Sequence, residues 1–127
     1  MLQSMLLVSV LALNPSVTQE NIQQTICIKG YTKSVRPTSS FTNIIKAQML
    51  REQGIEAEDI SLFELDHKIP LAIGGNPSNL ENFQLQLWEE AKKKDAIERR
   101  LHKLVCKGDV LLKDARSCML NDWRKCP

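Results

Sequence analysis

The sequence predicts an α+β fold with two short neighbouring strands and several helices. Residues 62–69 form an apolar stretch of strand-like composition, and residues 82–87 alternate apolar and polar side chains with the period of a strand. Directly after the second stretch, the apolar residues adopt helical spacing. With 127 residues, the chain is long enough for one domain with a hydrophobic core but too short for two.

The composition excludes a disordered chain and gives a weak indication of a polyanionic partner. Hydrophobic residues make up 43% and charged residues 25% of the sequence, as in globular domains. The net charge is +2, but the part from Glu90 onward has 11 Lys and Arg against 6 Asp and Glu, whereas the preceding part has 6 against 9. A basic C-terminal third suits nucleic-acid binding, and it equally suits a solvated helix face.

The N-terminal residues 5–13 form an apolar run that is too short to span a bilayer as a helix. Its length is typical of a signal-peptide core, although no Lys or Arg precedes it. We therefore expect residues 1–19 to be a signal peptide or apolar leader, residues 20–127 to form one domain, and the protein to be secreted or periplasmic. The alternatives are a buried N-terminal helix and a cytoplasmic protein.

Four cysteines, an even number in a chain with a signal-like start, predict two disulfides. Three pairings exist, and we favour Cys27–Cys106 and Cys118–Cys126. The first would tie the N-terminal part of the domain to the long helix, and the second would clip the C-terminal tail. The alternative is a structural zinc site made of His102 and three cysteines, although its spacing matches no common zinc motif.

The front half of the chain is expected to contain a strand and a helix. Residues 25–28 alternate polar and apolar side chains and predict a short N-terminal strand. The Arg36–Pro37 step favours extended backbone. Ser39 or Ser40 is then expected to cap a helix that runs to about Gln53.

The back half is expected to contain the two neighbouring strands and two helices. Residues 55–61 predict a surface loop, and residues 70–81 a long loop with two adjacent glycines between the strands. A helix follows from Trp88 to Lys107, and another from about Asp109 to Asp122. The apolar residues expected on the inner faces of these helices are Trp88, Ala91, Ile97, Leu101, Leu104, Val105, Leu112, Ala115 and Met119.

Asp66 and His67 are unusual residues for the end of an apolar strand, because neither is cheap to bury unpaired. Adjacent strand residues point to opposite faces, and a Gly-Gly loop follows. A neutral histidine can take a proton from water, and a carboxylate suits a hard divalent ion. The alternative is a histidine hydrogen-bonded to Glu64 or to backbone.

The ordered set of motifs from Leu62 to Val105 resembles the HNH nucleases, the ββα-metal group. Asp-His, a Gly-Gly loop, an asparagine at the second strand and Lys-Asp in the helix stand in the family's order. The pieces that carry the resemblance are Asp66-His67, Ile69-Pro70-Leu71, Gly74-Gly75, Asn82-Phe83-Gln84-Leu85, Lys94-Asp95 and Leu104-Val105-Cys106-Lys107-Gly108, with Thr25-Ile26-Cys27, Arg36-Pro37 and Asp122-Trp123 outside that segment.

This resemblance implies a ββα core at about residues 62–105, made of a two-stranded antiparallel ribbon and a helix. It implies an endonuclease that hydrolyses phosphodiester bonds in DNA, with RNA as a further substrate, little sequence preference and no small-molecule cofactor. His67 would be the general base and Asp66 a ligand of one divalent ion. Mg²⁺ is expected, and Mn²⁺, Ni²⁺ and Zn²⁺ are alternatives. Asn82 would hold the backbone near His67, with Asn79 as the competing candidate.

The helix departs from the family pattern, because Glu90 stands where a His or Asn ligand is usual. Glu90 would then be the second metal ligand, and the alternative is a favourable acid in a first helical turn. In that case the ion would rest on Asp66, phosphate oxygens and waters, since Mg²⁺ tolerates few protein ligands. Arg36 would reach the phosphate or the leaving oxygen, unless it forms a surface ion pair. The side chains expected to contact nucleic-acid phosphates are those of Lys68, Lys92, Lys93, Lys94 and Arg99.

Two non-enzymatic classes remain as alternatives. One is a nucleic-acid-binding protein that keeps the fold without a complete metal site. The other is a secreted binding protein stabilised by disulfides or zinc. The sequence predicts no stable membrane span and leaves the oligomeric state open.

Overall fold

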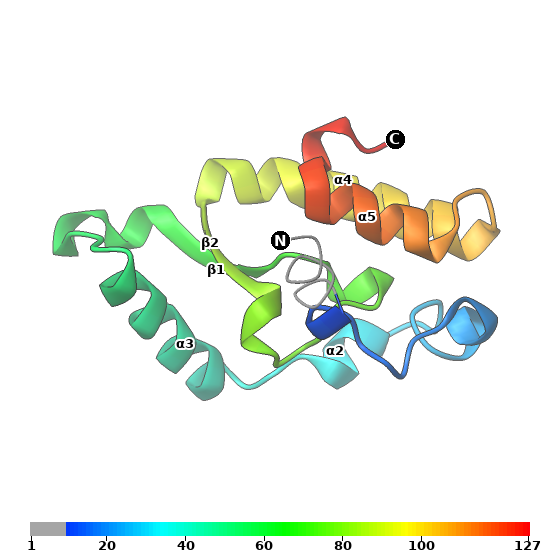
Figure 1. Ribbon diagram of the computed structural model, residues 1–127, viewed down its shortest axis with the longest axis horizontal. Coiled ribbons are helices and arrows are strands. Elements are labelled where there is room, and N and C mark those ends of the chain that lie inside the picture. The colour runs from blue at the N-terminus through cyan, green and yellow to red at the C-terminus, as the bar shows by residue number, and fades with distance from the viewer. Residues whose placement is uncertain (1–9) are drawn as a thin grey trace.

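The computed structural model describes residues 10–127 and confirms the α+β class: a two-stranded antiparallel hairpin packs against helices (Figure 1). Strands β1 (Phe63–His67) and β2 (Phe83–Leu87) lie between helix α3 (Ser39–Glu52) and helix α4 (Trp88–Lys107). The remaining elements are the helices α2 (Tyr31–Val35) and α5 (Leu112–Asp122) and the short 3₁₀ helices η1 (Gln19–Gln24), η2 (Ala57–Leu62), η3 (Leu71–Ile73), η4 (Leu80–Asn82) and η5 (Trp123–Lys125). The hairpin thus lies between one helix that precedes it in the chain and one that follows it.

The hairpin register places the Asp-His pair at the loop end of the ribbon. Asp66 pairs with Gln84 and His67 with Phe83, so that the strands end at the mouth of the 70–81 loop. Strand β1 is shorter than the predicted 62–69 stretch, because Ile69 bonds to the Asn82 side chain instead of the ladder. Pro70 follows and offers no amide hydrogen to continue the strand.

The predicted helices are present, with small changes at their ends. The cap of α3 is Thr38, whose hydroxyl accepts a hydrogen bond from the Phe41 amide at 3.3 Å, so Ser39 is the first helical residue. Helix α4 has the predicted bounds, with Gly108 in the left-handed conformation after it. The 55–61 segment, expected to be a loop, lies mostly in η2.

The predicted N-terminal strand at residues 25–28 is wrong. This segment turns back on η1, and the Cys27 amide donates to the Ile22 carbonyl. The alternation of side chains there reflects one buried residue, Ile26, and not pairing with a strand. The N-terminal part of the described chain contributes one isolated antiparallel bridge instead, between Leu13 and Gly75.

The hydrophobic core joins the N-terminal segment to α4 and α5. Ala12 and Val17, which fall in the expected 1–19 leader, are buried in it, so part of that segment belongs to the folded unit. The remainder of the leader prediction, residues 1–9, lies outside the described residues. Trp88 corrects the expected inner face of α4, since it is 46% exposed. The core cluster consists of Ala12, Val17, Ile22, Ile26, Ile69, Ile73, Leu101, Val105, Leu112, Ala115, Met119 and Cys126.

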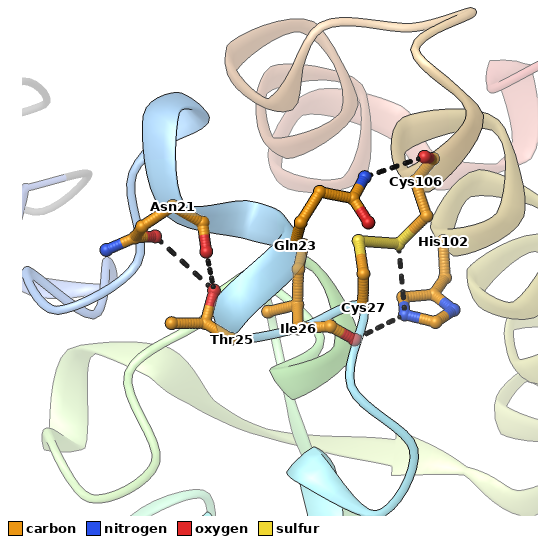
Figure 2. The surroundings of a disulfide bond; sticks show 7 residues. All are labelled: Asn21, Gln23, Thr25, Ile26, Cys27, His102 and Cys106. Atoms are coloured by element: carbon orange, nitrogen blue, oxygen red, sulfur yellow. Dashed lines mark hydrogen bonds between the residues drawn. A yellow bond between two sulfur atoms is a disulfide. The ribbon is translucent and has the colours of Figure 1, made fainter.

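Both favoured disulfides are present, which rules out the zinc alternative because its three cysteines are oxidised. Figure 2 shows how Cys27–Cys106 fastens the N-terminal segment to α4. Gln23 Nε2 donates to the Cys106 carbonyl at 3.0 Å, and His102 Nε2 donates to the Ile26 carbonyl at 2.7 Å. None of the helices within residues 10–127 is long and apolar enough to cross a membrane.

Candidate active site

Two adjoining pockets meet at the Asp66-His67 strand end. The first pocket lies toward the C-terminal half of α4, and the second lies toward α3. Arg36, Asp66 and His67 line both pockets and therefore form the centre of the site. The first pocket also includes Thr32, Glu98, Arg99 and His102, and the second also includes Thr42, Lys46, Glu64 and Trp88.

His67 is hydrogen-bonded to backbone, the contact that the non-catalytic alternative predicted, and this contact also fixes its tautomer. Its Nε2 lies 3.0 Å from the carbonyl oxygen of Pro77. A carbonyl can only accept a hydrogen bond, so Nε2 carries the proton and Nδ1 keeps its lone pair. Burial lowers the pKa of His67, although the Pro77 hydrogen bond and the Asp66 charge act in the opposite direction. The imidazole is therefore neutral near pH 7.

Asn82 braces the loop that presents Pro77 to His67. The side chain is fully buried, and its Oδ1 accepts a hydrogen bond from the Ile69 amide at 2.8 Å. Its Nδ2 donates to the carbonyls of Ile69 and Asn76 at 3.0 and 2.9 Å. These are the cross-loop contacts expected of it, whereas Asn79 caps η4 through the Glu81 amide.

Gly75 allows this loop to close. A Cβ at that position would lie 1.8 Å from the Ile69 carbonyl oxygen, a distance that no side chain tolerates. The same carbonyl accepts the Asn82 hydrogen bond. The Gly-Gly signal in the sequence therefore reflects a close approach of two backbone segments beneath the site.

Asp66 is engaged by both of its carboxylate oxygens. Oδ1 accepts a hydrogen bond from the His67 amide at 2.9 Å, and Oδ2 accepts one from Lys94 Nζ, also at 2.9 Å. Lys94 is fully buried, and its ammonium group also donates to the His67 carbonyl at 2.6 Å. The expectation that Lys94 contacts phosphates from the helix surface is therefore wrong, because its ammonium group is buried and paired with groups of the protein itself.

The acids around Lys94 hold their protons more tightly than usual. Burial raises the pKa of Glu64, Asp95 and Glu98, and the charge of Asp66 raises each further. The effect is largest for Glu98, whose pKa rises to about 7 even though Lys94 lowers it. Its Oε1 lies 3.3 Å from Lys94 Nζ.

The structure does not bring the expected pair of metal ligands together. Glu90 forms an ion pair with Arg124, at 2.6 Å between Oε2 and Nη2, and lines neither of the two pockets. Among residues 10–127, no three His, Cys, Asp or Glu side chains are grouped so that they could hold a metal ion. The assignment of Glu90 and Asp66 as a ligand pair is therefore not supported, because Glu90 binds the C-terminal tail and Asp66 binds Lys94.

The predicted phosphate-binding cations are divided by the fold. Arg99 lines the first pocket, and Arg36 lines both. Lys68 lies in a different pocket with Gln84 and Trp123, while Lys92 and Lys93 are exposed on α4 outside the two pockets.

Sequence reasoning missed Lys46 on α3 and His102 on α4 as residues of the site. The sequence suggests His102 only as a zinc ligand. Lys46 carries no motif, and only the packing of α3 against the hairpin brings it to the second pocket.

A scan against protein-family models, a search of curated proteins and a search of solved structures each found no match to this chain.

Proposed function

We propose that the protein hydrolyses phosphodiester bonds in nucleic acids, with His67 as the general base. The observation that carries the proposal is the hydrogen bond from His67 Nε2 to Pro77, which leaves Nδ1 basic in a site lined by Arg36. The resemblance of the motifs to HNH nucleases supports the same assignment. DNA is the expected substrate, and RNA offers the same phosphodiester chemistry.

In the proposed mechanism, His67 Nδ1 takes a proton from a water molecule as its oxygen attacks the phosphorus. The bond between phosphorus and the leaving oxygen breaks, and solvent returns a proton to that oxygen. Arg36 and Arg99 offset the negative charge that develops on the phosphoryl oxygens. Because contacts of this kind go to the sugar-phosphate backbone, cleavage is expected to show little sequence preference.

The two disulfides are typical of oxidising compartments, which supports an exported protein. An exported nuclease would meet free nucleic acid outside the cytoplasm. This assignment belongs to the proposal and is checked by fractionating cells that express the full-length chain.

The test is cleavage of supercoiled plasmid DNA by the purified protein, His67→Ala and Lys103→Ala. Lys103 is exposed on α4 outside both pockets and serves as the matched control. We expect His67→Ala to lose about two or more orders of magnitude in rate with an unchanged circular dichroism spectrum, since general-base catalysis contributes about that much. Full activity of the folded His67→Ala protein would refute the mechanism.

A second candidate is a nucleic-acid-binding protein without catalysis. The observation that favours it is the engagement of Asp66 by Lys94 where the family resemblance calls for a metal. Binding of DNA without cleavage in Mg²⁺, Mn²⁺, Ni²⁺, Zn²⁺ and EDTA would select this candidate.

A further inference from the structure

We propose that the ammonium group of Lys94 is the resident cation of this site, fixed between Asp66, His67 and Glu98, and that the protein needs no divalent ion at Asp66. The inference deepens the proposed function. Its catalytic test rests on that function, whereas its binding test does not.

Three oxygens surround the ammonium nitrogen. Nζ lies 2.9 Å from Asp66 Oδ2, 2.6 Å from the His67 carbonyl oxygen and 3.3 Å from Glu98 Oε1. Two carboxylate oxygens and a backbone carbonyl are the donor set of a hard cation. An ammonium group has three N–H donors. Lys94 donates to Asp66 and to the His67 carbonyl, and Glu98 Oε1 lies within ion-pair distance.

The burial of Lys94 follows from its position on α4. Ala91, Lys94, Leu101 and Val105 are the buried residues of α4, and they follow the spacing of one helical face. Lys94 thus occupies a core position toward the hairpin. Its nitrogen does not reach water, because the whole residue has no exposed surface. A buried ammonium is costly unless it is paired, and here the partners belong to the site itself.

The consequence for the site is electrostatic. The Lys94 charge offsets that of Asp66, which would otherwise repel an approaching phosphate, and the contact also fixes Asp66 against the His67 amide. Lys94 is therefore a positioning residue and not a catalytic one, because its nitrogen is enclosed and cannot touch the substrate. Direct neutralisation of the phosphate falls to Arg36 and Arg99.

The binding test uses Mn²⁺ and requires no activity. In the wild-type protein, we expect Mn²⁺ to leave the His67 ring resonances unbroadened in NMR spectra. Lys94→Ala should open a space lined by the same three oxygens and gain one Mn²⁺ site, seen by calorimetry, that Lys94→Ala/Asp66→Asn lacks. Lys93→Ala, the exposed neighbour on α4, should behave as wild type.

Two binding results would overturn the inference. One is a single Mn²⁺ ion that broadens His67 in the wild-type protein, a result that needs no variant to fold. The other is a folded Lys94→Ala protein that binds no Mn²⁺, because the three oxygens would then not be a cation site.

The catalytic test compares plasmid cleavage in EDTA and in Mg²⁺. We expect the wild-type rates to agree within about twofold, and Lys94→Met to lose about tenfold or more in both, each tenfold being about 1.4 kcal/mol of barrier. Cleavage that requires Mg²⁺ overturns the inference and leaves the proposed function standing. Absence of cleavage in every condition overturns the proposed function, and the Mn²⁺ measurements then decide the inference alone.

Discussion

Replacing Glu98 by Gln measures how much the ionisation of this buried carboxyl group lowers the free energy of unfolding. The Glu98 side chain is 20% exposed, and burial is the main cause that raises its pKa from 4.5 to about 7. Its Oε1 accepts no hydrogen bond of good geometry among the described residues, although Lys94 lies within ion-pair distance. Glutamine has the shape of the protonated acid and cannot ionise.

The sign follows from the raised pKa. Because the folded protein holds the Glu98 proton more tightly than the unfolded chain, this contribution to stability is fully present below pH 4.5. It is lost as the pH rises through about 7, where folded Glu98 ionises. This rise in the pKa corresponds to about 3 kcal/mol in the free energy of unfolding. E98Q should therefore match wild type at pH 4.5 and exceed it at pH 8.

The assay is urea unfolding at both pH values with the disulfides intact. The lowered pKa of His67 acts in the opposite direction, because its contribution is present above pH 6.5 and is lost as the pH falls. That contribution is common to both proteins, so the difference between them isolates Glu98. Glu89→Gln, an exposed acid on the same helix, is the control and should show no such pH dependence.

E98Q that is less stable than wild type at pH 8 would refute the reasoning. Such a result would mean that the ionised carboxylate gains more from Lys94 than it loses by burial.

Three further outcomes are expected. Arg36→Ala should reduce plasmid cleavage by about two orders of magnitude without changing the unfolding curve, since Arg36 lines both pockets and its charge acts on the phosphate; an unchanged rate would contradict this role. Asn82→Ala should lower the free energy of unfolding by about 2–4 kcal/mol in urea titrations, because three hydrogen bonds of a fully buried side chain are lost. A loss below about 0.5 kcal/mol would show that the loop keeps its conformation without these hydrogen bonds. Replacing both Cys27 and Cys106 by Ser should cost up to about 4.5 kcal/mol, the value that chain-entropy arguments give for a loop of 79 residues, measured as a shift of the denaturation midpoint. An unchanged midpoint would show that the hydrogen bonds of Gln23 and His102 hold the segment by themselves.

Local patterns in the sequence determined most of the secondary structure. Period-two alternation gave β2, helical spacing gave α4, and Gly108 ended α4 where expected. The same kind of pattern gave a wrong strand at residues 25–28, because an alternation of four residues does not show whether a partner strand is available for pairing. In the fold, a disulfide and the His102 hydrogen bond hold that segment against α4 as a turn.

The sequence also determined the centre of the candidate site, because Asp66 and His67 are neighbours on one strand and the Gly-Gly loop follows directly. Only the tertiary structure decided their surroundings. In a run of three lysines, each residue looks like a surface cation, and the docking of α4 on the hairpin selects Lys94 for burial while Lys92 and Lys93 stay exposed. Two ion pairs, Lys94–Asp66 and Arg124–Glu90, join residues that are 28 and 34 positions apart in the sequence. Such pairs depend on how the helices and strands pack, and the local periodicity of the sequence does not predict that packing.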